Sequence, residues 1–497
     1  MIYTCNQTLQ LQRAYANNVT LKPDLNTLED LKNSGWAPLS VKKEIAKNVV
    51  MRVRQKLPII KGFIGYDDSV LPQLTNALIA GHDIIFLGER GQGKTKLARG
   101  LVELLDEWMP IVKGSEINDS PYNPVSKYAT QLVNELKEKT PIDWVHRSKR
   151  FGEKLATPDT SVSDLIGEVD PVKVAEGRYL SDELTLHFGL IPRTNRGIFA
   201  INEIPDLSER IQVSLFNILE ERDLQIRGFN VRLPLDIFLV ASANPEDYTN
   251  RGRIVTPLKD RFGSQIRTHY PKDIALETSI ILAESSQPLV SEPIVKVPSF
   301  ITEIIATISQ LARLSPHVSQ QSGVSVRMSI TNYENVVANS VRRSLANDEL
   351  TAVPRISDLQ SLLPSTTGKI EIESFDEDES DTIIEKLLRS AVHSVYKATV
   401  PPENLGLIIS EFDGGKVFVT SSELSSKSYI TSLSEFSSLK ALSETLCDAN
   451  PDHAEIASAA ELILEGLYLA KRLNRDSSGD GSVFRIRDVA SGNSRKL

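Results

Sequence analysis

Residues 88–95 read GERGQGKT, a stretch that combines glycines, a lysine and a hydroxyl residue at a fixed spacing. Backbone N–H groups in such a glycine-rich loop can point at phosphate oxygens, the lysine can reach the β- and γ-phosphates, and the threonine hydroxyl can ligate Mg²⁺. The apolar run IIFL precedes the loop, and KLARGLVELL, with helical spacing, follows it. A helix N-terminus behind the loop favours negative charge. We therefore predict a site for ATP and Mg²⁺ formed by Gly88, Glu89, Arg90, Gly91, Gln92, Gly93, Lys94 and Thr95.

A second apolar run, GIFAINE over residues 197–203, ends in residues that could act on the phosphates. Glu203 could activate or orient the attacking water, and the alternative is an acid that caps a helix. Asn202 stands where an aspartate would be expected. Its amide oxygen can accept a hydrogen bond from a magnesium-bound water, but it brings no negative charge. We predict that Thr95 and Asn202 hold the metal and that Glu203 is catalytic.

A third apolar run, IFLVASAN, ends in Asn244, whose amide could hydrogen-bond both the attacking water and the γ-phosphate. The following TPLKDRFG offers Arg261, which could reach the γ-phosphate of a neighbouring subunit, and such an arginine is worth roughly 10³–10⁵ in turnover. Later, SGVSVRMS places Arg327 at the start of a helix that could fold over the nucleotide. For both arginines the alternative is a solvated surface charge. We predict Asn244, Arg261 and Arg327 as catalytic residues.

The apolar runs alternate with amphipathic stretches. Residues 206–222 carry apolar residues three or four positions apart, which predicts a helix with one apolar stripe. Strands that alternate with helices predict a parallel sheet covered by helices on both faces. From about residue 286 the strand signals fade. We therefore predict an α/β P-loop fold with an N-terminal helical segment at 1–60, an αβα core at 61–285, a helical lid at 286–345, a mainly helical C-terminal region at 346–475 and a flexible tail at 476–497.

The composition is that of a globular protein of about three domains, since 497 residues carry 40% hydrophobic and 24% charged side chains. The net charge of −9 argues against general binding to nucleic acid or to anionic membranes. Cys5 and Cys447 are too few for a disulfide framework. No run of 18 apolar residues and no secretory signal is visible, so we expect a cytoplasmic protein without a membrane span.

The order of the motifs resembles that of the AAA+ ATPases. GERGQGKT, GIFAINE, FLVASANPED, LKDRFG and GVSVRMS are similar to the P-loop, Walker-B strand, sensor 1, arginine finger and sensor 2 of that family. FIGYDD resembles the turn that contacts adenine, with Tyr66 in place of the glutamine common there. Residues 154–180 resemble the helix-2 insertion, and LEERDLQIRG the pre-sensor-1 insertion, of the MoxR and magnesium-chelatase I-subunit branch. The resemblance covers roughly residues 60–345.

The resemblance implies an ATP-hydrolysing homo-hexameric ring that remodels a partner, usually one with a von Willebrand factor A domain. Within this branch, a motor or chaperone and a true magnesium-chelatase ATPase subunit of tetrapyrrole synthesis both remain open. Two departures stand out, namely Asn202 and the long segment at residues 116–144. Asn202 favours a further alternative, a scaffold that binds ATP but hardly hydrolyses it. An enhancer-binding transcription activator would need a GAFTGA loop, which the sequence lacks.

Overall fold

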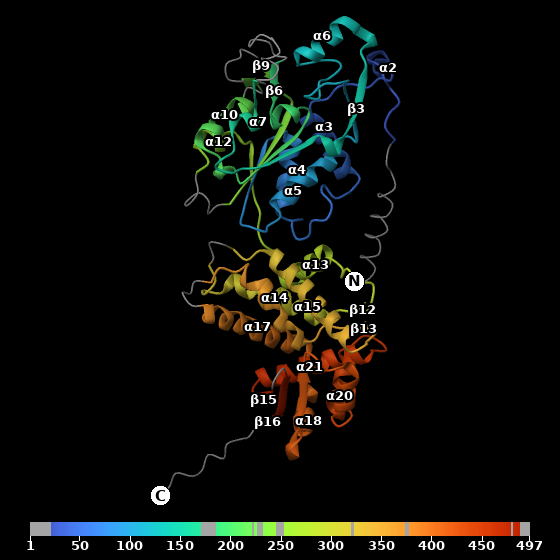
Figure 1. The fold of residues 1–497 in the computed structure, drawn as a ribbon, viewed down its shortest axis with the longest axis vertical. Coiled ribbons are helices and arrows are strands. Elements are labelled where there is room, and N and C mark those ends of the chain that lie inside the picture. Colours follow the sequence, from blue (N-terminus) through green and yellow to red (C-terminus); the bar gives the residue numbers. More distant parts are fainter. Residues whose placement is uncertain are drawn as a thin grey trace. The chain divides into compact units, whose positions relative to one another are not determined.

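The computed structural model describes residues 21–169, 185–220, 223–225, 232–244, 253–319, 323–372, 377–478 and 481–487 (Figure 1). These residues form two compact units. The first unit runs to His269 without Arg90–Gln92, and the second comprises Arg90–Gln92 and the described residues from Tyr270 onward. Each unit has its own hydrophobic core.

A five-stranded parallel sheet lies at the centre of the first unit. Its strands follow the order β11–β1–β10–β7–β4, and every neighbouring pair is parallel. Their bounds are β1 (Ile84–Leu87), β4 (Phe151–Leu155), β7 (Gly197–Asn202), β10 (Ile237–Ala243) and β11 (Ser264–Arg267). The three apolar runs of the sequence thus form adjacent strands, which confirms the predicted parallel α/β architecture.

Helices cover both faces of this sheet, and the alternation of side chains along the strands explains how. Ile84 and Phe86 belong to the core on one face, and Ile85 and Leu87 belong to the core on the other. The first core includes residues of α3 (Val41–Arg54), α4 (Val70–Ala80) and α5 (Lys94–Gly100), and the second includes residues of α10 (Glu209–Glu220) and α12 (Thr256–Arg261). Because both faces are buried, the strands read as continuous apolar runs.

The N-terminal segment is part of this unit. Helix α3 buries Val41, Ile45 and Val49 in the core of the sheet. Glu44 on the same helix accepts hydrogen bonds from both terminal nitrogens of Arg150, at 2.7 and 2.6 Å, and the two side chains are 7% and 1% exposed. Helix α3 of the predicted N-terminal helical segment at 1–60 is therefore part of the first unit, because its apolar face and its buried carboxylate both pack against the core.

The long segment at 116–144 joins the N-terminal residues in a small lobe. Strand β2 (Trp108–Val112) pairs antiparallel with β3 (Ile142–His146), and α6 (Lys127–Leu136) lies in the connection between them. Leu28, the first residue of helix α2 (Leu28–Asn33), donates from its N–H to the Thr140 carbonyl at 3.0 Å, and this bond ties α2 to the lobe. The lobe has a core of its own, made of Leu25, Leu31, Trp36, Trp108, Tyr122, Ile142 and Trp144.

Short elements complete the first unit. They are η1 (Leu101–Leu104), η2 (Lys137–Lys139), η3 (Arg147–Lys149), α7 (Val162–Leu165), β5 (Gly167–Val169), β6 (Leu186–Phe188), α9 (Leu190–Arg193), η5 (Ile204–Asp206), β8 (Asp223–Gln225) and β9 (Arg232–Pro234). Strand β5 lies inside the helix-2 insertion predicted at 154–180 and pairs antiparallel with β6, which follows that insertion. Residues 170–180 of the predicted insertion lie outside the described ranges. Strands β8 and β9 pair antiparallel, with β8 inside the segment predicted to resemble the pre-sensor-1 insertion.

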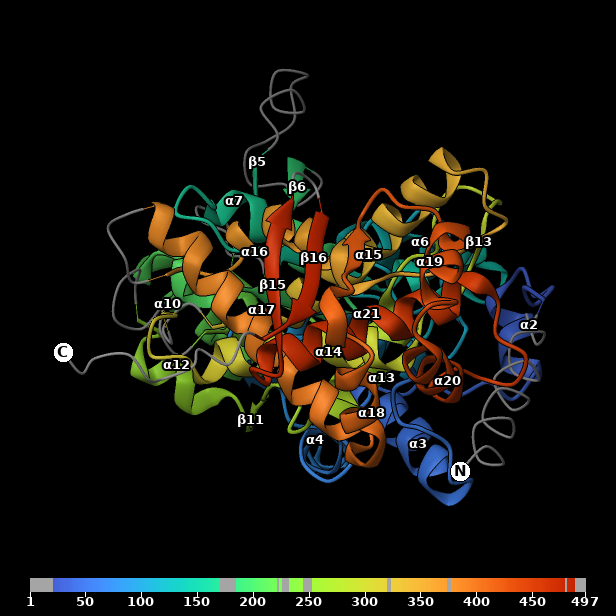
Figure 2. The same cartoon turned by 90° about the horizontal axis from the view of Figure 1, so that it is seen from below.

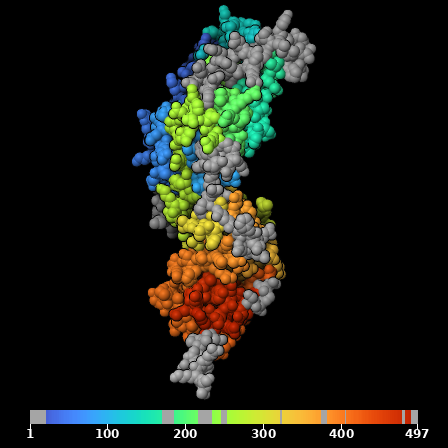
Figure 3. Space-filling view, turned by 90° about the vertical axis from the view of Figure 1, so that its left-hand side faces the viewer, coloured from blue at the N-terminus to red at the C-terminus, as the bar shows by residue number. Residues whose placement is uncertain are grey.

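The second unit is mainly helical, and it has one large hydrophobic core and a smaller cluster around Met328. Its helices are α13 (Ile274–Glu284), α14 (Ser299–Leu314), α15 (Val326–Ala346), η6 (Ile356–Leu362), α16 (Leu363–Thr367), α17 (Glu377–Thr399), η7 (Pro402–Asn404), α18 (Leu405–Ser410), η8 (Asp413–Gly415), α19 (Ser426–Leu433), α20 (Ser437–Thr445) and α21 (His453–Leu469). Ile304 of α14 and Ile463 of α21 belong to the same core, so the predicted lid and C-terminal region form one body. In Figure 3 the orange and red segments of this unit are continuous.

The boundary between the units differs from the predicted one at residue 285. Helix α13, expected in the core, belongs to the second unit. Its Glu277 is 1% exposed and accepts hydrogen bonds from Arg313 at 2.6 and 2.8 Å and from Ser329 at 2.6 Å. This buried carboxylate ties α13 to α14 and α15, and the sequence gives no sign of that pairing.

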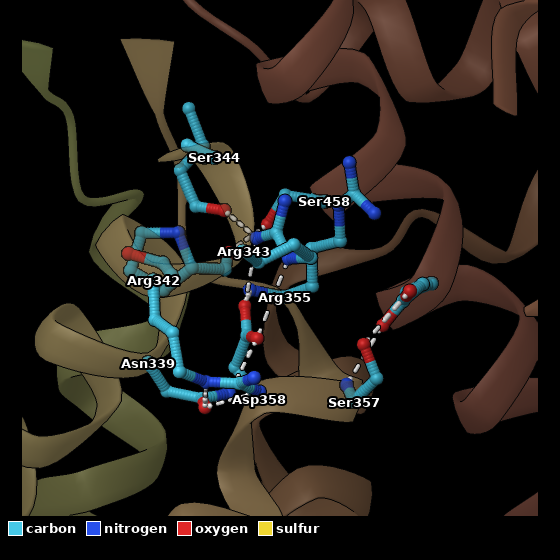
Figure 4. A network of polar contacts seen from close by, with 12 residues as sticks. Asn339, Arg342, Arg343, Ser344, Arg355, Ser357, Asp358 and Ser458 are labelled. Atoms are coloured by element: carbon cyan, nitrogen blue, oxygen red, sulfur yellow. Dashed lines mark hydrogen bonds and ion pairs between the residues drawn. The ribbon is translucent and has the colours of Figure 1, made fainter. Parts of the chain in front are cut away.

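A buried polar network joins α15 to the C-terminal elements (Figure 4). Arg343 and Asp358 are both 0% exposed and form an ion pair at 2.9 Å. Arg355 donates from its backbone N–H to Asp358 at 2.8 Å, and its guanidinium lies over the ring of Tyr429 at 4.4 Å from the centroid. The Tyr429 hydroxyl donates to Glu461, whose pKa is raised by burial. The network therefore spans α15, η6, α19 and α21.

The last described residues form strands. Strand β15 (Leu473–Ser478) pairs antiparallel with β16 (Gly481–Ile486), and the two lie side by side in Figure 2. Strand β16 also pairs antiparallel with β14 (Phe418–Ser421). Phe418 and Phe484 are opposite each other in this sheet and are buried in the core of the second unit. The prediction of a flexible tail from residue 476 is wrong for these strands, because Leu473 and Phe484 anchor the otherwise polar β15–β16 hairpin in the core of the second unit. Elsewhere, β12 (Ile294–Val295) pairs with β13 (Thr351–Ala352).

Two absences hold for the described ranges. No helix in them is both long enough and apolar enough to cross a membrane. No group of three or more His, Cys, Asp or Glu side chains in them is placed to hold a metal ion. Cys447 is partly buried, and burial raises the pKa of its thiol to about 11. Cys5 lies outside the described residues.

Candidate nucleotide-binding site

The glycine-rich loop leaves the carboxyl end of β1. Gly91 and Gly93 have φ of 77°, a left-handed backbone that favours glycine. Gly93 is the N-cap of α5, and no side chain caps that helix. Lys94, the first residue of α5, is 6% exposed, and its ammonium donates to the carbonyl oxygen of Gly88 and, at 2.8 Å, to that of Glu89. The loop thus curls around the lysine, as the motif requires. Arg90, Gly91 and Gln92 group with the second unit.

Two further predicted residues lie beside Lys94. The ammonium of Lys94 also donates to Oδ1 of Asn244 at 2.5 Å. The amide nitrogen of Asn244 in turn donates to Oε2 of Glu203 at 3.2 Å. Asn244 is 4% exposed. The structure therefore brings Lys94, Asn244 and Glu203 together at the carboxyl ends of β1, β10 and β7, although they are up to 150 residues apart.

The backbone of Glu203 is held in an unusual conformation. Its φ and ψ are 55° and 50°, in the left-handed region that a residue with a side chain seldom adopts. Its N–H donates to the hydroxyl of Ser242 on the neighbouring strand at 3.3 Å. Such conformations persist when the surroundings determine them, and they concentrate at functional sites. The turn directs the Glu203 side chain toward Asn244.

Asn202 lies between two polar side chains of adjacent strands. Its amide nitrogen donates to Oε1 of Glu153 on β4 at 2.6 Å, and its amide oxygen accepts from the Ser242 hydroxyl at 3.2 Å. Glu153 also accepts from Arg99 of α5 at 2.7 and 3.1 Å, and these bonds raise the pKa of the Arg99 guanidinium. Sequence reasoning missed Glu153. The signal that points to it is the asparagine itself, which needs an acceptor for its amide nitrogen.

The FIGYDD turn lies next to the loop. A Cβ added to Gly93 would lie 3.4 Å from the Phe63 ring, and the ammonium of Lys96 is 5.1 Å from the centroid of that ring. Phe63 stacks on Tyr66, with ring centroids 6.1 Å apart. Tyr66 donates from its hydroxyl to the His269 carbonyl at 3.0 Å, and burial raises its pKa to about 12. Tyr66 is therefore a buried structural residue, and Phe63 is the aromatic residue against the loop.

The two predicted arginines lie on different units. Arg261 is the last residue of α12, partly buried, and its guanidinium donates to the Pro257 carbonyl of the same helix at 3.1 Å. Arg327 is exposed in the first turn of α15, and its N–H donates to the N-cap Ser325 at 3.1 Å. The roles of both arginines toward a nucleotide stay predictions.

The residues present fit ATP with Mg²⁺. A buried ammonium in a curled loop matches the charge of the phosphates. Thr95, the second residue of α5, and Asn202 offer hard oxygen donors of the type that Mg²⁺ uses together with water and phosphate. The carboxylate of Glu153, which is paired with Arg99, accepts a hydrogen bond from the Asn202 amide.

Comparison with known proteins finds similarities over part of the chain. Residues 130–262 match the model of the AAA domain of the dynein-related subfamily. The chain is 26% identical over 254 residues to the magnesium-chelatase subunit ChlI of Mesostigma viride, covering 49% of this chain and 65% of the relative. It is 26% identical over 231 residues to ChlI of a Nostoc species, covering 44% and 56%. The matched segments thus span less than two thirds of these relatives.

One solved structure is also similar to part of the chain. A model of the complex between BchI and BchD of magnesium chelatase, based on cryo-EM, is 20% identical and covers 66% of this chain and 97% of the matched chain, with a TM-score of 0.34. At that TM-score the likeness adds nothing to the assignment. Residues 130–262 thus match an AAA domain, and about half of the chain is similar to the magnesium-chelatase ChlI subunits.

Proposed function

We propose that this protein is an ATPase that couples hydrolysis in an oligomeric ring to the remodelling of a partner protein, as a motor or chaperone of the MoxR and magnesium-chelatase type. The observation that carries the proposal is the chain of hydrogen bonds from Lys94 through Asn244 to Glu203. It lies at the carboxyl ends of three parallel strands, where open α/β sheets bind their ligands.

Each residue of the site has its own role in hydrolysis. Lys94 binds the β- and γ-phosphates. Thr95 and Asn202 would hold Mg²⁺, which neutralises charge on the phosphates when it is bound. Glu203 accepts the proton of the attacking water or orients it, and Asn244 fixes Glu203 and the water relative to the γ-phosphate. Each of these positions requires the strand ends that the fold supplies.

Oligomerisation completes the site in this proposal. Arg261 reaches the γ-phosphate bound by the adjacent protomer of a hexamer, and Arg327 contacts it from the second unit. Hydrolysis removes both contacts, so that the second unit can move against the first and displace a bound partner. A partner with a von Willebrand factor A domain and a cytoplasmic location belong to the same proposal.

Phosphate release by the wild type and by Glu203→Gln tests the proposal. The wild type hydrolyses ATP, whereas Glu203→Gln binds it with similar affinity and loses about 10²–10⁴ in turnover, the range that general-base catalysis contributes. A wild type that binds ATP without turnover would support the scaffold alternative, which Asn202 favours. A wild type that binds no ATP would refute both.

A second candidate is a true chelatase subunit, which the relatives favour because both are named as magnesium-chelatase subunits. Its test is the insertion of Mg²⁺ into protoporphyrin by the other chelatase subunits, assayed with this protein as their sole ATPase. ATP-dependent insertion would establish this role. Steady ATP hydrolysis without insertion would favour the motor or chaperone.

A further inference from the structure

The amide of Asn202 has a single orientation, and its neighbours determine it. A carboxylate only accepts hydrogen bonds, so the atom facing Glu153 at 2.6 Å must be the amide nitrogen. The amide oxygen then faces the Ser242 hydroxyl at 3.2 Å and keeps a second lone pair. Asn202 is 8% exposed, so few waters compete for these positions.

Glu153 links this amide to the helix that follows the glycine-rich loop. Its two oxygens accept from Nε and a terminal nitrogen of Arg99, at 2.7 and 3.1 Å. Arg99 belongs to α5, the helix that begins at Lys94. Two-pronged pairs of this kind fix geometry as well as charge. Glu153 therefore stands between α5 and the end of β7.

The link continues to the predicted base. Ser242 donates to Asn202 and accepts from the N–H of Glu203 at 3.3 Å. Through Ser242, the orientation of the Asn202 amide therefore helps to hold the left-handed backbone of Glu203. Glu153, Asn202 and Ser242 come from three adjacent strands, β4, β7 and β10, so only the folded sheet brings them together.

An aspartate at position 202 would not fit these neighbours. The nitrogen that donates to Glu153 would become an oxygen, and two ionised carboxylates would face each other at hydrogen-bond distance. Like charges at that separation destabilise each other. The asparagine and the glutamate are therefore complementary, and the carboxylate of this pair lies on β4 rather than on β7.

We propose that Glu153 is a positioning residue of the ATPase site: it fixes the Asn202 amide so that its oxygen, which accepts from Ser242, keeps a lone pair for a magnesium-bound water, and it provides on β4, paired with Arg99, the carboxylate that β7 lacks at position 202. The inference rests on the proposed function. It explains how a site without the expected aspartate can still turn over. Strand β4 therefore contributes to the site through Glu153, which none of the sequence motifs includes.

A charge-swap series tests the proposal, with wild type, Glu153→Ala, Asn202→Asp and the double variant Glu153→Gln/Asn202→Asp. Glu153→Ala and Asn202→Asp each lower kcat about 10- to 100-fold, the range for a lost hydrogen bond to a charged group, while KM for ATP stays within about 3-fold. The double variant returns the carboxylate to β7 beside an amide donor, and it restores kcat to within a few-fold. Glu138→Gln, which removes an exposed carboxylate paired with Lys32, is the control and leaves kcat unchanged.

Two results would overturn the inference: full activity of Asn202→Asp alone, or a double variant no better than Asn202→Asp. Thermal unfolding of the four proteins without nucleotide or metal provides a readout that does not need turnover. There the Asn202→Asp variant has a lower Tm, and the double variant recovers it. If the wild type lacked ATPase activity but the Tm values followed this pattern, the pair would be confirmed and the proposed function would fail separately.

Discussion

The ammonium of Lys94 donates to Oδ1 of Asn244 at 2.5 Å, and the other end of the same amide donates to Glu203 at 3.2 Å. One amide therefore connects the phosphate-binding lysine to the candidate base. Asn244 can do this because it offers an acceptor and a donor on opposite sides of one plane. An aspartate in its place could accept from Lys94 but could not donate to Glu203 when ionised.

The first prediction concerns this amide. Asn244→Ala removes the fixation of Glu203 and lowers kcat about 10²–10³-fold, as loss of one positioned polar group in an active site does. Affinity for ATP changes little, because the glycines and Lys94 remain. Steady-state phosphate release and binding of a fluorescent ATP analogue measure the two effects. Asn26→Ala, at an exposed asparagine, serves as the control. Unchanged kcat in Asn244→Ala would remove Asn244 from the site.

The second prediction concerns the shared site. Arg261→Ala binds ATP normally but loses assembly-dependent turnover, because the arginine acts on the neighbour's nucleotide. Lys94→Ala loses ATP binding but keeps its own Arg261. Mixing the two inactive proteins should therefore regain part of the wild-type turnover at mixed boundaries, measured as phosphate release against mixing ratio. Normal hydrolysis by Arg261→Ala, or mixtures that stay inactive, would contradict a site completed by the neighbour.

The third prediction concerns the buried pair of Glu44 and Arg150. Glu44→Ala leaves the Arg150 guanidinium uncompensated in the core, which costs about 3–5 kcal/mol of unfolding free energy. All three tryptophans of the chain, Trp36, Trp108 and Trp144, belong to the first unit. Tryptophan fluorescence in a urea titration therefore reports on that unit. Lys47→Ala, on the exposed side of the same helix, should shift the midpoint little. An equally small shift for Glu44→Ala would mean that α3 is not anchored by this pair.

The fourth prediction concerns the second unit. Asp358→Ala removes the nearer of two ion-pair partners of Arg343 and leaves Glu349 at 3.7 Å. Because Arg343 and Asp358 are both fully buried, we expect a loss of about 3–5 kcal/mol of unfolding free energy. The loss should appear in the helical signal by circular dichroism but not in tryptophan fluorescence, since the second unit holds no tryptophan. Glu385→Gln, at an exposed pair with Arg389, is the control. A fluorescence transition that moved with the helical signal would show that the two units unfold together.

The sequence alone predicted the strands, the glycine-rich loop and the identity of Lys94, Asn244 and Glu203. These features are local: a loop motif is a fixed spacing, and a buried parallel strand is a short apolar run. The arrangement of polar residues at strand ends follows directly, since the carboxyl ends of parallel strands meet at one edge of the sheet.

Only the tertiary structure decided the partners across strands and helices. Glu153 meets Asn202 from 49 residues away, and the register of β4 against β7 makes that contact. The same holds for Glu44 with Arg150, which places the N-terminal helix in the core, and for the paired strands β15 and β16, where a flexible tail was predicted. The sequence does not show whether a carboxylate will be solvated by water or paired with a buried guanidinium. That difference depends on which elements pack together in the folded protein.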